Sequence, residues 1–221
     1  MQKTVRRKTL DQIKHNPTPQ ELYKKLMASD GWEYKTDKEK YLIRDRALVA
    51  LLYLGDFRIS EVIPIIKNQF EHMQNYILVK DVLVSKKRKG KIVYREAKLP
   101  LEGERACFTQ LILSYLETIG DLDRLFPWSL KKKEYKEGTY TTRKGEKKDR
   151  VSVQMIGTKR GWQIVNALLP EYTQHWLRAF GYNYDYDHMN HDIMAVSDKT
   201  KADPISLQPY LRRRYDKYTV Q

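Results

Sequence analysis

The sequence predicts a mainly α-helical fold with a small antiparallel β-sheet or hairpin, and three observations lead to this prediction. Residues 41–54 carry the strongest helical pattern of apolar side chains. Residues 76–84 are rich in Val, Ile and Leu, as in a strand, and residues 92–101 return as a second strand after a basic turn. A further segment with an apolar side, residues 105–119, follows the second strand and is typical of a helix. With 221 residues, 41% of them hydrophobic, the chain can form one domain with a real core.

The beginning of the chain, residues 1–17, is basic and polar and is expected to form a tail or linker before a domain at 18–221. A helix should begin directly after it. Thr18 can cap this helix, Pro19 suits its first position, and Glu21 completes a capping box with Thr18.

The strongest predicted helix, 41–54, has a broad apolar face made of Leu42, Ala47, Leu48, Leu51, Leu52 and Tyr53. Gly55 is expected to end this helix. A short second helix is predicted at 57–63, before Pro64.

The two predicted strands form a β-hairpin whose tip, residues 85–91, is loaded with lysine and contains Gly90. The second strand ends at Pro100, and a helix is predicted next, at 105–119. Its apolar side consists of Phe108, Leu111, Ile112, Tyr115, Leu116 and Ile119.

A basic insertion is predicted at about 129–152. Residues 131–150 hold nine Lys or Arg against four Asp or Glu, a net charge of +5, and their glycines and threonine pairs disfavour a regular helix. A solvated loop or an exposed hairpin is therefore expected.

Short helices are predicted after this insertion, at 161–169, 173–180 and 192–196. Asp203-Pro204 is expected to open a last helix that carries Tyr210.

The composition restricts the kind of partner. The net charge of +14 and the isoelectric point near 9.6 favour a polyanion, with nucleic acid first and a ribosomal or membrane-surface protein as alternatives. Mean hydropathy is −0.72, and the longest apolar run, near 47–54, is far too short for a membrane span. Cys107 is the single cysteine, so no intramolecular disulfide or Cys-based zinc site is expected, in keeping with a reducing interior.

The candidate chemistry is transfer of a phosphodiester without a metal ion. Such a reaction needs a nucleophile, groups that hold the charge on the phosphate, and a proton for the leaving oxygen. No carboxylate cluster for Mg²⁺ is evident, but Arg58, His175, Arg178 and Tyr210 offer two guanidinium groups, an imidazole and a phenol. Arginine binds phosphate oxygens bidentately and stays charged at any working pH.

These residues, in this order, resemble the tyrosine recombinases, the phage-integrase type of DNA strand transferase. The resemblance is strongest over residues 44–61 around Arg58. It continues through the hairpin lysines, the box His175-Trp-Leu-Arg178, and Tyr210, which lies 32 residues after Arg178. It covers roughly residues 18–215 and implies the catalytic-domain fold of that family.

The resemblance also implies a role for each residue of the two arginine boxes. Arg58 and Arg178 would bind the scissile phosphate, with Glu61 supporting Arg58 from behind. His175 would hydrogen-bond the phosphate or take the proton of the tyrosine, since imidazole carries protons near neutrality. Tyr210 would be the nucleophile.

Three further assignments within this pattern have alternatives or depart from the family. The hairpin should supply the proton donor for the leaving 5′ oxygen, which we expect to be Lys86 or else Lys87. DNA contacts are expected from Lys87, Arg88, Lys89 and Lys91. Tyr215 and Tyr218 compete with Tyr210 as nucleophile. Lys201 stands nine residues before Tyr210, where the family has His or Trp, and Ala179 replaces a usual histidine; Lys201 can still donate a hydrogen bond to phosphate.

The predicted function is breakage and rejoining of DNA through a 3′-phosphotyrosyl intermediate, in site-specific recombination or integration. The resemblance implies an enzyme without metal or cofactor that acts on double-stranded DNA as a homo-tetramer and needs no membrane and no small-molecule substrate. It would work in the cytoplasm of a prokaryotic host, encoded there or by a virus or plasmid. Residues 1–17 are too few for the N-terminal clamp domain of the family. Two alternatives are relaxation of DNA as in type IB topoisomerases, and a non-enzymatic basic DNA-binding module.

Overall fold

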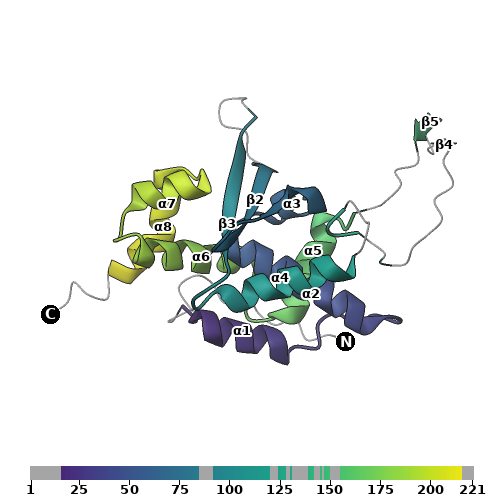
Figure 1. Ribbon diagram of the computed structural model, residues 1–221, viewed down its shortest axis with the longest axis horizontal. Coiled ribbons are helices and arrows are strands. Elements are labelled where there is room, and N and C mark those ends of the chain that lie inside the picture. The colour runs from purple at the N-terminus through teal and green to yellow at the C-terminus, as the bar shows by residue number, and fades with distance from the viewer. Residues whose placement is uncertain are drawn as a thin grey trace.

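The computed structural model describes residues 16–84, 92–119, 124–127 and 155–215, together with residues 130, 139–141, 145 and 147–149. Figure 1 shows helices gathered beneath and beside a small sheet. The helices are α1 (Pro19–Ala28), α2 (Lys38–Leu54), α3 (Ile59–Val62), α4 (Ala106–Thr118), α5 (Thr158–Leu168), α6 (Gln174–His188), α7 (Ile193–Thr200) and α8 (Pro204–Tyr215). Among these described residues, no helix has both the length and the apolar character that crossing a bilayer requires.

The first helix begins as predicted. The Oγ1 of Thr18 accepts a hydrogen bond from the N–H of Glu21 at 3.2 Å, and the Glu21 carboxylate accepts one from the N–H of Thr18 at 2.8 Å. This is the expected capping box.

Helix α2 is the centre of the helical core. Residues 47–54 are all buried, and α2 packs against α4, α5 and α6. The backbone N–H of Gly55 closes the last turn by donating to Leu51, so the helix ends where the sequence predicts. The following helix α3 has only four residues, and is shorter than the predicted 57–63.

The sheet has three antiparallel strands in the order β1-β2-β3. Strands β2 (Tyr76–Leu83) and β3 (Tyr94–Pro100) are the predicted hairpin, whereas β1 (Phe70–His72) was not predicted. Along β3 every second residue is buried, beginning with Arg95, so this side faces the helices. The lysine-rich tip, 85–91, lies outside the described residues.

Most of the predicted basic insertion at 129–152 also lies outside the described residues. Two short described strands within it, β4 (Thr139–Thr141) and β5 (Lys147–Asp149), pair in antiparallel fashion.

The last two helices rest on a small core of their own. The main cluster of buried apolar residues runs from α1 to the middle of α6. A second cluster joins the end of α6 to α7 and α8, and consists of Tyr182, Tyr186, Val196, Ala202, Leu207 and Leu211. The α6 helix continues to His188, well beyond the predicted end at 180, and so provides the platform for this second cluster. Figure 1 shows α7 and α8 together at one end of the molecule.

Candidate active site

Arg58 is held by the turn between α2 and α3. It precedes the first residue of α3, and its backbone N–H and its Nη1 both donate to the carboxylate of Glu61, each at 2.9 Å. Glu61 is buried, but the side chain of Arg58 is 31% exposed. The carboxylate therefore holds the arginine from inside and leaves its guanidinium accessible; the supporting role of Glu61 in catalysis stays a prediction.

Arg95 on β3 is a second partner of Glu61 that the sequence did not reveal. Its Nη2 donates to Oε2 of Glu61 at 3.2 Å, and its Nη1 donates to the backbone carbonyl of Thr200 at 3.1 Å. The guanidinium lies over the ring of Phe57, 4.2 Å from the ring centroid. Burial opposes the charge of Glu61, but Arg95 and the hydrogen bonds from Arg58 outweigh it and lower the pKa of Glu61. Arg95 thus links the first arginine box to the end of α7.

The second box lies on the first turns of α6. His175 and Arg178 are three residues apart and face the same side of the helix. The Nε of Arg178 donates to the backbone carbonyl of Asp56 at 2.7 Å, which ties this arginine to the turn that carries Arg58. Its guanidinium lies 5.0 Å from the centroid of the Tyr182 ring.

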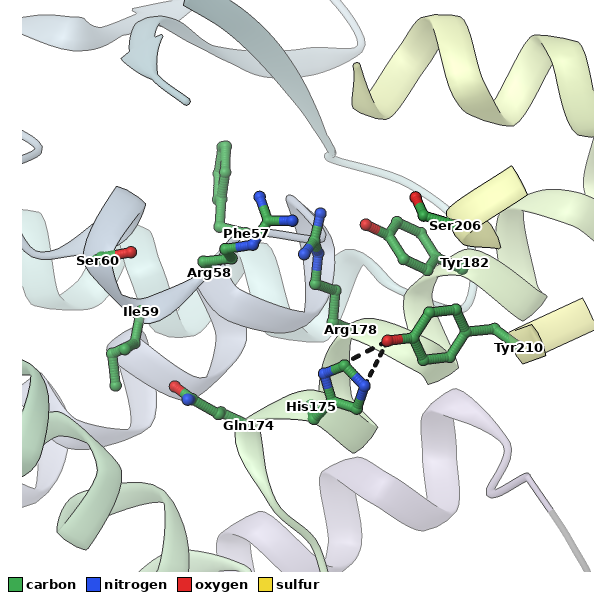
Figure 2. A pocket seen from close by; sticks show the side chains of 10 residues that line it. All are labelled: Phe57, Arg58, Ile59, Ser60, Gln174, His175, Arg178, Tyr182, Ser206 and Tyr210. Atoms are coloured by element: carbon green, nitrogen blue, oxygen red, sulfur yellow. Dashed lines mark hydrogen bonds between the residues drawn. The ribbon is translucent and has the colours of Figure 1, made fainter. Parts of the chain in front are cut away.

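Tyr210 reaches this site from α8. Its hydroxyl is hydrogen-bonded to Nε2 of His175, and the centroids of the two rings are 5.1 Å apart. The ring of Tyr182 meets that of Tyr210 edge-on at 5.7 Å. Figure 2 shows the Tyr210 hydroxyl directed at the imidazole, with the guanidinium groups of Arg58 and Arg178 near one another.

The protonation of the pair follows from its surroundings. Burial lowers the pKa of His175, and the charges of Arg178 and Arg58 lower it further, so the imidazole is neutral at pH 7. Burial raises the pKa of Tyr210, although Arg178 and Arg58 act in the opposite direction. The phenol therefore keeps its proton. With the Nδ1–H tautomer of His175 the hydroxyl donates to Nε2, and in this arrangement the imidazole can act as a base towards the phenol.

The side chains of Arg58, His175, Arg178 and Tyr210 all line one pocket of about 380 Å³. The other residues around it are Phe57, Ile59, Ser60, Gln174, Tyr182 and Ser206. Four of the predicted catalytic residues, from segments up to 152 residues apart in sequence, are thus brought to one cavity.

Most of the other predicted site residues lie outside the described part of the chain. Lys86, Lys87, Arg88, Lys89 and Lys91 lie outside the described residues, as does Tyr218. Tyr215 is the last residue of α8.

Lys201 is described, and lies just after α7 in the left-handed region with φ of 51°. It is exposed and does not line the pocket. Its proposed contact with phosphate stays a prediction.

A buried pair of carboxyl groups, Asp56 and Asp185, lies behind the site. Asp56 is fully buried, has a positive φ of 51°, and lies against Gly181 of α6. The neighbouring Asp185 accepts hydrogen bonds from Arg105 at 3.0 Å and from Lys199. Burial, and next the charge of Asp185, raise the pKa of Asp56, whereas Lys199 and Arg105 outweigh burial and lower that of Asp185. Asp56 is therefore the protonated member of this carboxyl pair.

Comparison with family models gave no match, and no curated protein matched. Among solved structures, the post-cleavage complex of the XerH site-specific recombinase with a palindromic difH substrate superposes with a TM-score of 0.53 at 17% identity. The match covers 93% of this chain and 52% of that one. For the pre-cleavage XerH complex with difH, the TM-score is 0.52 at 18% identity, over 94% and 55% of the two chains.

The chain therefore spans about half the length of these XerH chains. The likeness shows that it has the fold of a tyrosine recombinase catalytic domain, which confirms the fold predicted from the sequence.

Proposed function

We propose that this chain is the catalytic domain of a DNA strand transferase of the site-specific recombinase or integrase kind. The observation that carries the proposal is the hydrogen bond from the Tyr210 hydroxyl to a neutral His175 in a pocket that also holds Arg58 and Arg178. A fold shared with XerH supports the same function, since XerH is a recombinase bound to its DNA substrate.

Arg58 and Arg178 would hold the scissile phosphate. Both guanidinium groups line the pocket, and each is anchored through part of its hydrogen-bonding capacity: Arg58 through Glu61 and Arg178 through the carbonyl of Asp56. The nitrogens left over can bind the non-bridging phosphate oxygens, on which negative charge builds as the reaction proceeds. Because both arginines are anchored beforehand, little reorganisation is needed in the transition state.

Tyr210 would attack the phosphorus in line. A bond forms between the phenolic oxygen and phosphorus, the bond from phosphorus to the 5′ oxygen breaks, and the phenol proton passes to Nε2 of His175. The product is a 3′-phosphotyrosyl link and a free 5′ hydroxyl. Attack by a second 5′ hydroxyl reverses these steps, and no external energy source is required because the phosphodiester energy is kept in the covalent link.

The leaving 5′ oxygen needs a proton, which we assign to Lys86 or Lys87 of the hairpin tip. The neighbouring Arg88, Lys89 and Lys91 would bind the DNA backbone. Lys201 would add a hydrogen bond to the phosphate once DNA is bound. Neither metal nor cofactor enters these steps.

The proposed setting is double-stranded DNA held by a homo-tetramer. The net charge of +14 suits such a partner. We propose a domain organisation of a basic tail at 1–17 and a catalytic domain at 18–221 that carries the basic insertion at about 129–152. The enzyme would act in the cytoplasm of a prokaryotic host.

The test is covalent trapping. The protein is incubated in EDTA with a pool of nicked duplexes whose sequence is randomised around the nick, so that a cleaved strand loses its short end and cannot be religated. We expect a protein–DNA adduct on a denaturing gel that is lost in Tyr210→Phe and kept in Tyr215→Phe and Tyr218→Phe. DNA binding without any adduct would contradict the proposal and favour the non-enzymatic module. Adduct formation with relaxation of supercoiled plasmid, and without strand exchange, would favour the topoisomerase-like reaction.

A further inference from the structure

The hydroxyl of Tyr182 has no hydrogen-bond partner within the described part of the chain, although it is buried in the wall of the active-site pocket. Tyr182 lies on α6 four residues after Arg178, so both side chains leave the same face of the helix. Only 2% of the residue is exposed. Neither the sequence pattern nor the family resemblance assigned it a role.

An unpaired buried hydroxyl needs an explanation. Taking an O–H out of water without giving it a partner costs free energy, and nearly all buried polar groups in native proteins are paired. Tyr115, which is still more deeply buried, follows this rule, because its hydroxyl donates to the carbonyl of Leu125 at 2.6 Å. Tyr182 differs from it in facing a cavity whose other walls carry cations.

The surroundings indicate what would satisfy this hydroxyl. The ring of Tyr182 contacts both the guanidinium of Arg178, which lies 5.0 Å from the ring centroid, and the ring of Tyr210, which it meets edge-on at 5.7 Å. In Figure 2 its hydroxyl points toward the guanidinium groups of Arg178 and Arg58. A guanidinium only donates hydrogen bonds and cannot accept the proton of Tyr182, whereas an anion bound between these groups could accept hydrogen bonds from all three.

The hydroxyl is suited to donate rather than to attack. Burial raises the pKa of Tyr182; Arg178, Arg95 and Arg58 oppose this shift and Asp56 adds to it, and the pKa stays above that of a free tyrosine. The hydroxyl therefore stays protonated at any working pH. Within the described residues the Tyr182 hydroxyl has no hydrogen-bonded base, whereas the Tyr210 hydroxyl is hydrogen-bonded to His175.

We propose that the Tyr182 hydroxyl donates a hydrogen bond to a non-bridging oxygen of the phosphate held by Arg58 and Arg178, and so stabilises the charge that develops there. This inference rests on the proposed function and adds a catalytic residue to it. Tyr182 supplies, from inside the pocket, the kind of neutral donor that would complement the two guanidinium groups.

The decisive variant is Tyr182→Phe, which removes one oxygen and keeps the ring in contact with Arg178 and Tyr210. We expect the single-turnover rate of adduct formation at saturating DNA to fall about 100- to 1000-fold, as when one donor to a developing oxyanion is lost. DNA affinity should change less than about twofold. Because an unpaired hydroxyl has been removed, the melting temperature should stay the same or rise.

The matched control is Tyr115→Phe, which removes a buried hydroxyl that is paired and lies outside the pocket. Its melting temperature should fall while its rate of adduct formation stays at the wild-type value. A Tyr182→Phe protein that cleaves as fast as wild type would overturn the inference. So would a Tyr182→Phe protein that loses rate only in step with its stability.

A second measurement separates this inference from the proposed function. Binding of inorganic phosphate is followed by its effect on the melting temperature in wild type, Tyr182→Phe and Tyr115→Phe. Stabilisation by phosphate that is weakened only in Tyr182→Phe supports the donor role even if wild type forms no adduct, in which case the strand-transfer function alone fails. An adduct in wild type with equal rates and equal phosphate binding in Tyr182→Phe leaves the function standing and refutes the donor role.

Discussion

The Nε of Arg178 donates a 2.7 Å hydrogen bond to the backbone carbonyl of Asp56, two residues before Arg58. One turn therefore positions both arginines: the first through the chain itself and the second through this bond. The conformation of this turn depends on Asp56, whose buried carboxyl lies against α6 and whose backbone is in the left-handed region.

Asp56 should make the stability of the protein depend on pH. Burial raises its pKa to about 8, well above that of an unfolded aspartate near 4. The folded state binds the carboxyl proton of Asp56 more tightly than the unfolded state does. The contribution of this proton to the free energy of unfolding is therefore complete below pH 4 and is lost as the pH rises towards 8. Asp56→Asn cannot ionise and keeps nearly the same side-chain shape. We expect the melting temperature of this variant, relative to wild type, to rise by about 5 °C or more between pH 5 and pH 8.

The control for this measurement is Asp198→Asn, which changes an exposed aspartate on α7. Its melting temperature relative to wild type should be the same at both pH values. An equal response of the two variants would show that Asp56 is ionised in the folded protein.

Gly181 should not tolerate a side chain. A Cβ at this position would lie 1.7 Å from Oδ1 of Asp56 and 2.8 Å from the carbonyl oxygen of Tyr53. Alanine normally stabilises a helix relative to glycine, but here we expect Gly181→Ala to cost about 3 kcal/mol of unfolding free energy in urea titration. Gly157→Ala is the control, because nothing lies within 4 Å of its Cβ position. Combining Gly181→Ala with Asp56→Ala should recover part of the loss; strict additivity would place the clash elsewhere.

Arg95 should hold the C-terminal helices to the domain. Its replacement by Met breaks the buried contacts with Glu61 and with the carbonyl of Thr200, and we expect a loss of about 3 kcal/mol. Hydrogen exchange should accelerate first in peptides from α7 and α8. The control Lys98→Met alters an exposed residue of the same strand and should leave these peptides unchanged. Uniform acceleration across α2 and α4 would instead assign Arg95 to the main core.

His175 should set the acidic limb of the cleavage reaction. It must be neutral to accept the proton of Tyr210, and its pKa is lowered by burial and by Arg178 and Arg58. The rate of adduct formation should therefore rise with pH through a midpoint below the ordinary histidine value of about 6.5 and be level above it. His175→Ala should lose about 100-fold in rate and this limb as well. A limb that persists in His175→Ala belongs to another group.

The sequence predicted the elements whose pattern is long and periodic, and missed those that depend on tertiary contacts. The apolar face of α2 and its end at Gly55 follow from residue spacing alone. The strand β1 has only three residues, too few for an alternating pattern. Arg95 lies on the buried side of β3 with Ala97 and Leu99, but only the folded chain reveals that its partner there is Glu61.

The site residues could be predicted where the order and spacing of reactive side chains match a known pattern. Arg58, His175, Arg178 and Tyr210 were found because their order and separation resemble a known family. Tyr182 was not, because the significance of its hydroxyl lies in the partner it lacks, and no sequence pattern records that. Lys201 was selected by counting back from Tyr210, whereas in the fold the residue follows α7 and faces solvent.

The second cluster of buried residues, which joins α6 to α7 and α8, bears on how much of the time Tyr210 lies beside His175. Tyr210 packs against both this core and the main one, so the nucleophile sits at a seam between two cooperative units. The free energy that keeps it beside His175 is that of a local docking equilibrium and is smaller than the stability of the whole domain. Opening of this seam would withdraw Tyr210 while Arg58, before α3, and Arg178, on α6, stay in place. Under the proposed function, the chain would then keep its hold on a DNA backbone in molecules that are, at that instant, unable to cut it.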